Sequence, residues 1–139
     1  EAVISRALSE RVWMKSGAYL VIQPTEALTV IDVNTGKCIA GKKDDGVYMK
    51  INLEAAKEAA KQIRLRNLSG MILIDFINLK SKERTNELLE FFEKELRKDP
   101  VQTILVDMTG LQLVEVTRKK VRKPLKEVVV SAKGANGLK

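Results

Sequence analysis

Two apolar segments of this 139-residue chain each end in a carboxylate, and they constrain the fold more than any other feature. The first runs from Leu28 through Asp32 to Gly36, and the second runs from Met71 through Asp75 to Phe76. Such runs are typical of buried strands, in which a carboxylate without a partner is costly. Two strands that each carry one suggest that the carboxylates share a partner, and a divalent cation is the obvious candidate.

The remaining segments predict the other elements of an α/β domain. The expected strands cover residues 11–15, 18–23, 27–33, 71–77, 101–107 and 111–116, and the first two form a β-hairpin around Ser16-Gly17. Asn52 can cap one helix, which Gly70 stops, and Ser81 can cap a second that ends before Pro100. We therefore predict the α/β class, with a mixed β-sheet and flanking helices in a single domain.

This arrangement predicts a site at one end of the sheet. Strand periodicity places Asp32 and Asn34 on the same face. The helix over residues 52–67 has the length of a crossover between parallel neighbours, so Asp75 can lie level with Asp32. Ligands gather at the carboxyl ends of strands in such sheets. Two carboxylates, waters and a substrate phosphate oxygen would then complete a Mg²⁺ shell.

Two structural alternatives stay open for these residues. Asp32 and Asn34 could belong only to a turn, in which their side chains cap backbone groups. Asp75 could form a structural ion pair with Arg64 or Arg66 at the end of the preceding helix.

The charge of the chain favours polyanionic partners. The formal net charge is +7, which suits nucleic acid but also fits a merely basic globular domain. A basic run could grip a nucleic-acid backbone, or it could be a solvated helix face; it contains Arg118, Lys119, Lys120, Arg122 and Lys123. Aromatic residues make up only 4% of the chain, so composition gives little sign of a base-stacking platform.

Other residue counts exclude several classes of chemistry. The chain has no histidine, which excludes Ser–His and Cys–His nucleophiles and His-ligated zinc within it. Cys38 is the single cysteine, so an intrachain disulfide is impossible, which fits a reducing cytoplasm. No apolar run approaches the roughly 20 residues of a membrane span.

Six segments resemble, in order and spacing, the catalytic region of the ribonuclease E/G family over about residues 5–123. They are Val12-Trp-Met-Lys-Ser-Gly17, Pro24-Thr-Glu-Ala-Leu-Thr-Val-Ile-Asp-Val-Asn-Thr-Gly36, Asn52-Leu-Glu-Ala-Ala56, Gln62-Ile-Arg-Leu-Arg-Asn-Leu68, Gly70-Met-Ile-Leu-Ile-Asp-Phe-Ile77 and Leu113-Val-Glu-Val-Thr-Arg-Lys119. The resemblance implies a deoxyribonuclease-I-like catalytic subdomain over residues 1–124, with a flexible tail over residues 125–139.

The same resemblance implies a function and roles for individual residues. Family members are bacterial endoribonucleases of RNA decay and ribosomal RNA maturation, which cut single-stranded RNA and leave 5′-phosphate and 3′-hydroxyl ends. Asp32 and Asp75 would bind the catalytic Mg²⁺, for which Mn²⁺ can substitute. Asn34 would orient the first carboxylate or the scissile phosphate.

The chain also departs from the family pattern. It begins at Glu1, so we expect a piece of a longer protein, weak alone because the OB-fold domain and the sensor of the RNA 5′ end precede this region in the family. Residues 127–134 replace the family's Cys-Pro-x-Cys zinc link, which puts zinc-mediated dimerisation in doubt, although a homo-oligomer of the full-length protein remains an expectation. Gln112 stands where the family often has Gly.

Two other functions compete with a nuclease. The chain could be a non-catalytic basic RNA-binding module, or a scaffold for oligomerisation. Within the family we favour the shorter, G-like type over the E-like type.

Overall fold

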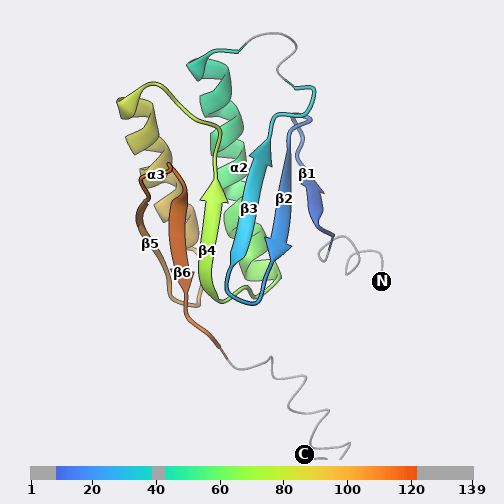
Figure 1. Cartoon of the computed structure of the whole chain (residues 1–139), viewed down its shortest axis with the longest axis vertical. Coiled ribbons are helices and arrows are strands. Elements are labelled where there is room, and N and C mark those ends of the chain that lie inside the picture. The colour runs from blue at the N-terminus through green and yellow to red at the C-terminus, as the bar shows by residue number, and fades with distance from the viewer. Residues whose placement is uncertain (1–8, 39–42, 122–139) are drawn as a thin grey trace, which may run out of the picture.

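A mixed six-stranded sheet in the order β1-β2-β3-β4-β6-β5 forms the centre of the computed structural model (Figure 1), which describes residues 9–38 and 43–121. The strands are β1 (Arg11–Trp13), β2 (Tyr19–Pro24), β3 (Thr29–Asn34), β4 (Gly70–Asp75), β5 (Thr103–Met108) and β6 (Val114–Arg118). The helices are α2 (Asp45–Leu65) and α3 (Lys82–Leu96). The predicted α/β class, the mixed sheet and the single domain are therefore confirmed.

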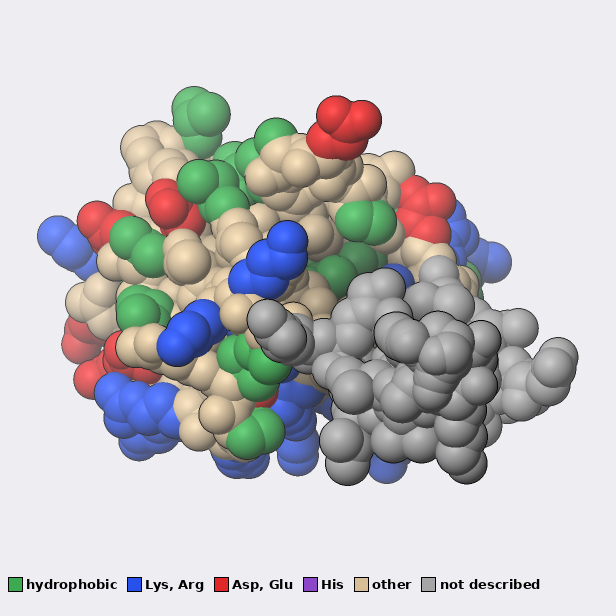
Figure 2. All heavy atoms as spheres, turned by 90° about the horizontal axis from the view of Figure 1, so that it is seen from below, with side chains coloured by type: hydrophobic (Ala, Val, Ile, Leu, Met, Phe, Trp, Pro, Cys, Tyr) green, Lys and Arg blue, Asp and Glu red, His purple; other side chains and the backbone are tan. Residues whose placement is uncertain are grey.

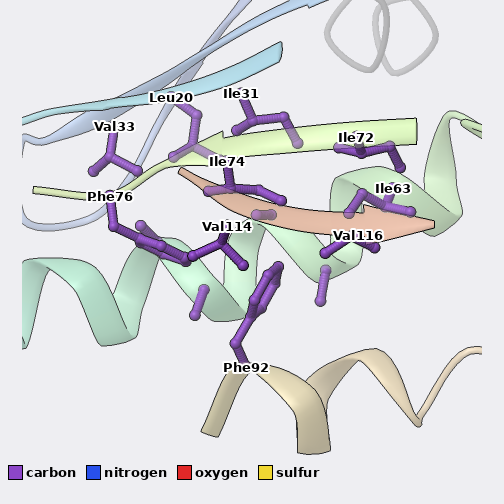
Figure 3. Packing of buried hydrophobic residues seen from close by; sticks show 14 of the residues in the cluster. Leu20, Ile31, Val33, Ile63, Ile72, Ile74, Phe76, Phe92, Val114 and Val116 are labelled. Atoms are coloured by element: carbon purple, nitrogen blue, oxygen red, sulfur yellow. The ribbon is translucent and has the colours of Figure 1, made fainter. Parts of the chain in front are cut away.

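The two strands that end in carboxylates are central neighbours. β3 and β4 pair in parallel, whereas the other four pairings in the described sheet are antiparallel. Because parallel neighbours need a crossover, α2 connects β3 to β4 across one face of the sheet. α3 packs beside α2 on that same face, as Figures 1 and 3 show, so the described helices leave the opposite face open.

The core lies between the sheet and the two helices (Figure 3). Alternate residues of the central strands point into it, such as Ile31 and Val33 of β3 and Ile72 and Ile74 of β4. Phe76 meets Phe92 of α3 edge to face, with ring centroids 5.4 Å apart. The residues between these positions, including Asp32 and Asp75, consequently face the open side of the sheet.

Helix α2 begins earlier than the sequence predicted. Its cap is Asp44, whose side chain accepts a hydrogen bond from the Val47 N–H, so residues 45–49 are helical rather than loop. Asn52 is therefore no cap and lies fully buried inside the helix. The cap proposed for α3 is confirmed, since the Ser81 hydroxyl accepts from the Arg84 N–H at 3.2 Å.

Several expectations fall outside the described residues. The tail over residues 125–139 and the segment that replaces the zinc link both lie there. In the part of the chain that the structure describes, neither helix is long and apolar enough to cross a membrane.

Candidate functional site

Asp32 and Asp75 lie at paired positions on β3 and β4, near the carboxyl ends of both strands. The parallel register aligns them directly, and the core-facing residues beside them fix both side chains on the open face. Each carboxylate is half-buried. The predicted alignment of the two carboxylates is therefore present in the fold.

The electrostatics of this pair favour a proton or a cation. Burial raises the pKa of Asp75, and the negative charge of the neighbouring Asp32 raises it further. None of the ion pairs formed within residues 9–38 and 43–121 involves either side chain. Two carboxylates that are close together and form no ion pair among the described residues make a site that a divalent cation would neutralise.

Asn34 lies beside the pair, two residues after Asp32 on the same face of β3. Its amide Nδ2 donates a hydrogen bond of 3.3 Å to Oδ2 of Asp32. Asn34 can therefore orient this carboxylate, which leaves Asp32 with a preferred rotamer for a ligand on the open face.

Gly36 holds the end of β3 against the turn between β1 and β2. Its φ of 59° lies in the left-handed region. A Cβ at this position would collide with the backbone carbonyl oxygen of Gly17. Glycine is therefore required here both by the backbone conformation and by the close approach of the two chain segments.

Buried Asn52 fixes the chain immediately after Asp75. Its Nδ2 donates to the Ile77 carbonyl oxygen at 2.8 Å, and its Oδ1 accepts from the Ile77 N–H at 2.9 Å. The side chain thus pairs with both backbone groups of Ile77 as an adjacent strand would. Sequence reasoning missed this role, although an amide among the small apolar residues of α2 was a signal for it.

Asp45 in the first turn of α2 holds the loop that follows β4. Its carboxylate accepts from the N–H groups of Lys80 and Ser81 at 3.1 and 2.7 Å, and Arg84 lies 3.8 Å from it. The two backbone hydrogen bonds lower the pKa of Asp45. Together, Asn52 and Asp45 tie α2 to the segment that carries Asp75.

Asp32 and Asp75 alone would form only an incomplete coordination shell for a metal ion. In the described ranges, no group of three Asp, Glu, Cys or His side chains could hold a metal ion. Asp32 and Asp75 would provide two oxygen ligands, and waters or a phosphate would have to provide the others. This donor set fits Mg²⁺, which usually keeps several waters and binds through one or two carboxylates plus substrate phosphates.

The alternatives for the acidic residues have little support in the described contacts. Arg64 donates to the Glu95 carbonyl, and Arg66 donates to Gln62 and to the Ser9 carbonyl, so neither pairs with Asp75. The hydrogen bonds of the described residues show no backbone group capped by Asp32 or Asn34.

Arg118, which the sequence predicts to contact RNA, has a buried side chain. Its guanidinium donates to Asp99 at 2.7 Å, to Asn67 Oδ1 at 2.7 Å and to the Leu68 carbonyl at 2.8 Å. Arg118 therefore joins β6 to the segments around α2 and α3.

The described part of the basic run also lies far from the carboxylates. Arg118 pairs with Gly70 at the start of β4, five residues before Asp75, which corresponds to roughly 17 Å along a strand. Lys119 and Lys120 are exposed at that end, whereas Arg122 and Lys123 lie outside the described residues. Figure 2 views this end, where basic side chains are interspersed with acidic and hydrophobic ones.

Arg11, Trp13 and Tyr19, on β1 and β2, form a cluster that the amino-acid composition did not reveal. The rings of Trp13 and Tyr19 lie 4.6 Å apart between centroids, at 48° to each other. The Arg11 guanidinium carbon lies 4.4 Å from the Tyr19 ring and 5.7 Å from the Trp13 ring. The predicted hairpin could have revealed this cluster, because pairing of its two strands places Arg11, Trp13 and Tyr19 on one face of the sheet.

A groove near the end of β4 does not contain the carboxylates. It has a volume of about 410 Å³ and begins at Phe76 and Ile77, continuing along the start of α3. Because Phe76 points toward the helices, this groove lies on the other side of the strand from Asp75.

Comparison with known proteins relates the whole described region to one family. Residues 1–121 match the sequence model of the ribonuclease E/G family. Ribonuclease G of Escherichia coli (strain K12) is 41% identical over 129 residues, which cover 93% of this chain and 26% of the relative. Ribonuclease G of Haemophilus influenzae is 42% identical over the same shares.

Ribonuclease E of a Nostoc species is 45% identical over 119 residues, or 86% of this chain and 17% of the relative. The chain thus spans about a quarter or less of the length of these curated relatives.

Proposed function

Because this chain belongs to the ribonuclease E/G family, we propose that it is the catalytic subdomain of a metal-dependent endoribonuclease. The alignment of Asp32 with Asp75 on the open face of the sheet carries this proposal. The relatives named ribonuclease G and ribonuclease E support the reaction class.

Asp32 and Asp75 are the proposed metal ligands, with Mg²⁺ as the natural ion and Mn²⁺ as a substitute. When bound, the ion would activate water and neutralise the charge that develops on the phosphate. Asn34 keeps the Asp32 carboxylate oriented through its hydrogen bond. Asn52 acts through the backbone of Ile77 and is a positioning residue for Asp75.

The proposed substrate is single-stranded RNA, cut to leave 5′-phosphate and 3′-hydroxyl ends in RNA decay and ribosomal RNA processing. An extended strand would cross the open face of the sheet, which the described helices do not cover. Lys119 and Lys120 would contact RNA only far from the reacting phosphate, and Arg122 and Lys123, which lie outside the described residues, remain proposed RNA contacts. Action in the cytoplasm and assembly of the full-length protein into a homo-oligomer belong to the same proposal.

A Mn²⁺ titration of the isotopically labelled chain, followed by NMR, tests the metal site directly. We expect paramagnetic broadening centred on Asp32, Asn34 and Asp75, which Mg²⁺ should reverse. Asp32→Asn should abolish the local broadening, whereas Glu26→Gln, at an exposed position in the turn between β2 and β3, should not change it.

Cleavage of a labelled single-stranded RNA at high protein concentration tests the activity. We expect slow Mg²⁺-dependent cleavage that Asp32→Asn and Asp75→Asn each abolish while both variants remain folded. RNA binding without localised broadening or cleavage would instead support a non-catalytic RNA-binding module. Loss of folding in both variants would mean that the carboxylates are structural.

A further inference from the structure

The cluster of Arg11, Trp13 and Tyr19 has the chemistry of a base-stacking site. Trp13 is 61% exposed although it lies in the sheet, so a large part of its indole faces solvent. Tyr19 packs against it, and the Arg11 guanidinium lies over the Tyr19 ring. Stacking on aromatic faces next to a cation is a common way for proteins to bind single-stranded nucleic acid.

The cluster is aligned with the carboxylate site across the sheet. Trp13 pairs with Tyr19, and Tyr19 pairs with Asn34, so the three form one row over β1, β2 and β3. These three strands lie side by side in Figure 1. Strands are about 4.8 Å apart, which places Trp13 roughly 10 Å from Asn34. Arg11 belongs to the next row, which continues through Val21 to Asp32 and Asp75.

We infer that Trp13, supported by Tyr19, stacks on a base of the single-stranded RNA substrate next to the cleavage site, and that Arg11 binds the adjoining phosphate. This inference rests on the proposed function and adds a substrate-positioning subsite to it. Every base offers a π-face, so the subsite would hold RNA without strong sequence preference. The row of Trp13, Tyr19 and Asn34 would guide the RNA across β2 toward the two carboxylates.

Trp13 itself reports on the interaction, because it is the single tryptophan of the chain. We would titrate the chain with a short oligoadenylate in EDTA, which prevents cleavage, and follow Trp13 fluorescence. An abasic oligomer with the same number of phosphates is the matched ligand control. We expect oligoadenylate to quench the fluorescence and to bind about tenfold more tightly than the abasic oligomer.

Variants separate stacking from charge. By fluorescence anisotropy of a labelled oligoadenylate, Trp13→Leu should weaken binding about tenfold, whereas Trp13→Phe should retain most of it. Leu111→Ala removes another exposed apolar side chain, in the turn between β5 and β6, and should have no effect. Arg11→Gln should lower the slope of log affinity against log salt by about 0.7, the value for one phosphate contact on a single strand.

The outcomes distinguish this inference from the proposed nuclease. Equal binding of the two oligomers without quenching would overturn the stacking site even if the chain cleaves RNA. Quenching and base-dependent binding in a chain that never cleaves RNA would support the stacking site while the nuclease proposal fails. A concentration-dependent dimer that Trp13→Leu abolishes, with RNA affinity unchanged, would show that the cluster binds a second copy and would overturn the inference.

Discussion

Asp75 lies directly opposite Asp32 on the adjacent parallel strand, and the charge of Asp32 helps to raise the pKa of Asp75. Two negative charges at paired positions on neighbouring strands oppose folding unless a proton or a cation lies between them. The pair is therefore a feature that stability alone would not favour. Several measurable consequences follow from it and from the residues that hold it.

Asp75→Asn should stabilise the metal-free chain at neutral pH while it removes activity. The folded state raises the pKa of Asp75 above 3.8, first through burial and then through Asp32. The unfolded chain therefore loses its proton first, and stability falls as the pH rises from about 3.8 through the folded pKa. Urea unfolding in EDTA at several pH values should show the stability of the variant relative to the native chain increasing across that window and staying constant above it.

Addition of Mg²⁺ is the control for this prediction. The ion should stabilise the native chain and reduce its deficit relative to Asp75→Asn, since the ion neutralises the charge that caused the deficit. A variant that is less stable than the native chain at neutral pH without metal would contradict the account of the pair.

Asn52→Ala should lower both stability and metal affinity. The substitution leaves the N–H and the carbonyl of Ile77 without partners in a partly buried region, which should cost about 2–4 kcal/mol. Gln62→Ala is the matched control, because it removes another buried amide from the far end of the same helix. The midpoint temperature of thermal unfolding should fall for both variants, but the affinity for Mn²⁺ should fall only for Asn52→Ala. An equal loss of Mn²⁺ affinity in both variants would refute the positioning role.

Gly36→Ala should disturb the end of β3. The new Cβ would collide with the Gly17 carbonyl, and the left-handed φ would add strain, for a total of about 1–3 kcal/mol. Gly110→Ala, whose Cβ would meet no atom within 4 Å, should have little effect. Denaturation midpoints and backbone chemical shifts of Asn34 would measure the difference between the two variants.

The pair of Asp99 and Arg118 should make the fold sensitive to acid. Burial alone would raise the pKa of Asp99, but hydrogen bonds from Arg118, the Val101 N–H and the Thr103 hydroxyl together lower it. Its contribution to stability is therefore present above pH 3.8 and is lost as the pH falls through the lower folded pKa. Asp99→Asn should cost about 3–5 kcal/mol at neutral pH, because it leaves the buried Arg118 without its counterion.

The acid-unfolding profile gives a second check on this pair. The stability difference between the native chain and Asp99→Asn should shrink in acid, and a constant difference would contradict the assignment. Surface pairs such as Arg97 with Glu93 are exposed and should show no comparable effect when one partner is replaced.

Gln112→Gly should stabilise the chain by up to about 1 kcal/mol. Gln112 has a φ of 63°, a left-handed conformation that costs a residue with a side chain more than it costs glycine. The greater freedom of glycine in the unfolded chain offsets part of this gain. Thermal unfolding of the variant is the measurement, and a loss of stability would mean that the Gln112 side chain makes a compensating contact.

The local pattern of the sequence was enough to predict the strands with carboxylates and their neighbours. Continuous apolar runs indicated central strands, and the helix between them implied a parallel crossover, which aligns Asp32 with Asp75. The same reasoning failed for Asn52. An Asn near the expected start of a helix is interpreted as its N-cap, but the N-cap of α2 is Asp44.

What the sequence determined by itself was the order of the elements, the α/β class and the position of Asp32, Asn34 and Asp75 at one end of the sheet, since these follow from periodicity and crossover geometry. Only the tertiary structure decided which polar side chains lie inside. Arg118 belongs to a basic run in the sequence, yet it is buried against Asp99 because β6 is inserted between β4 and β5. The aromatic pair of Trp13 and Tyr19 is likewise six residues apart in the chain and meets through strand pairing, which places distant side chains within contact distance.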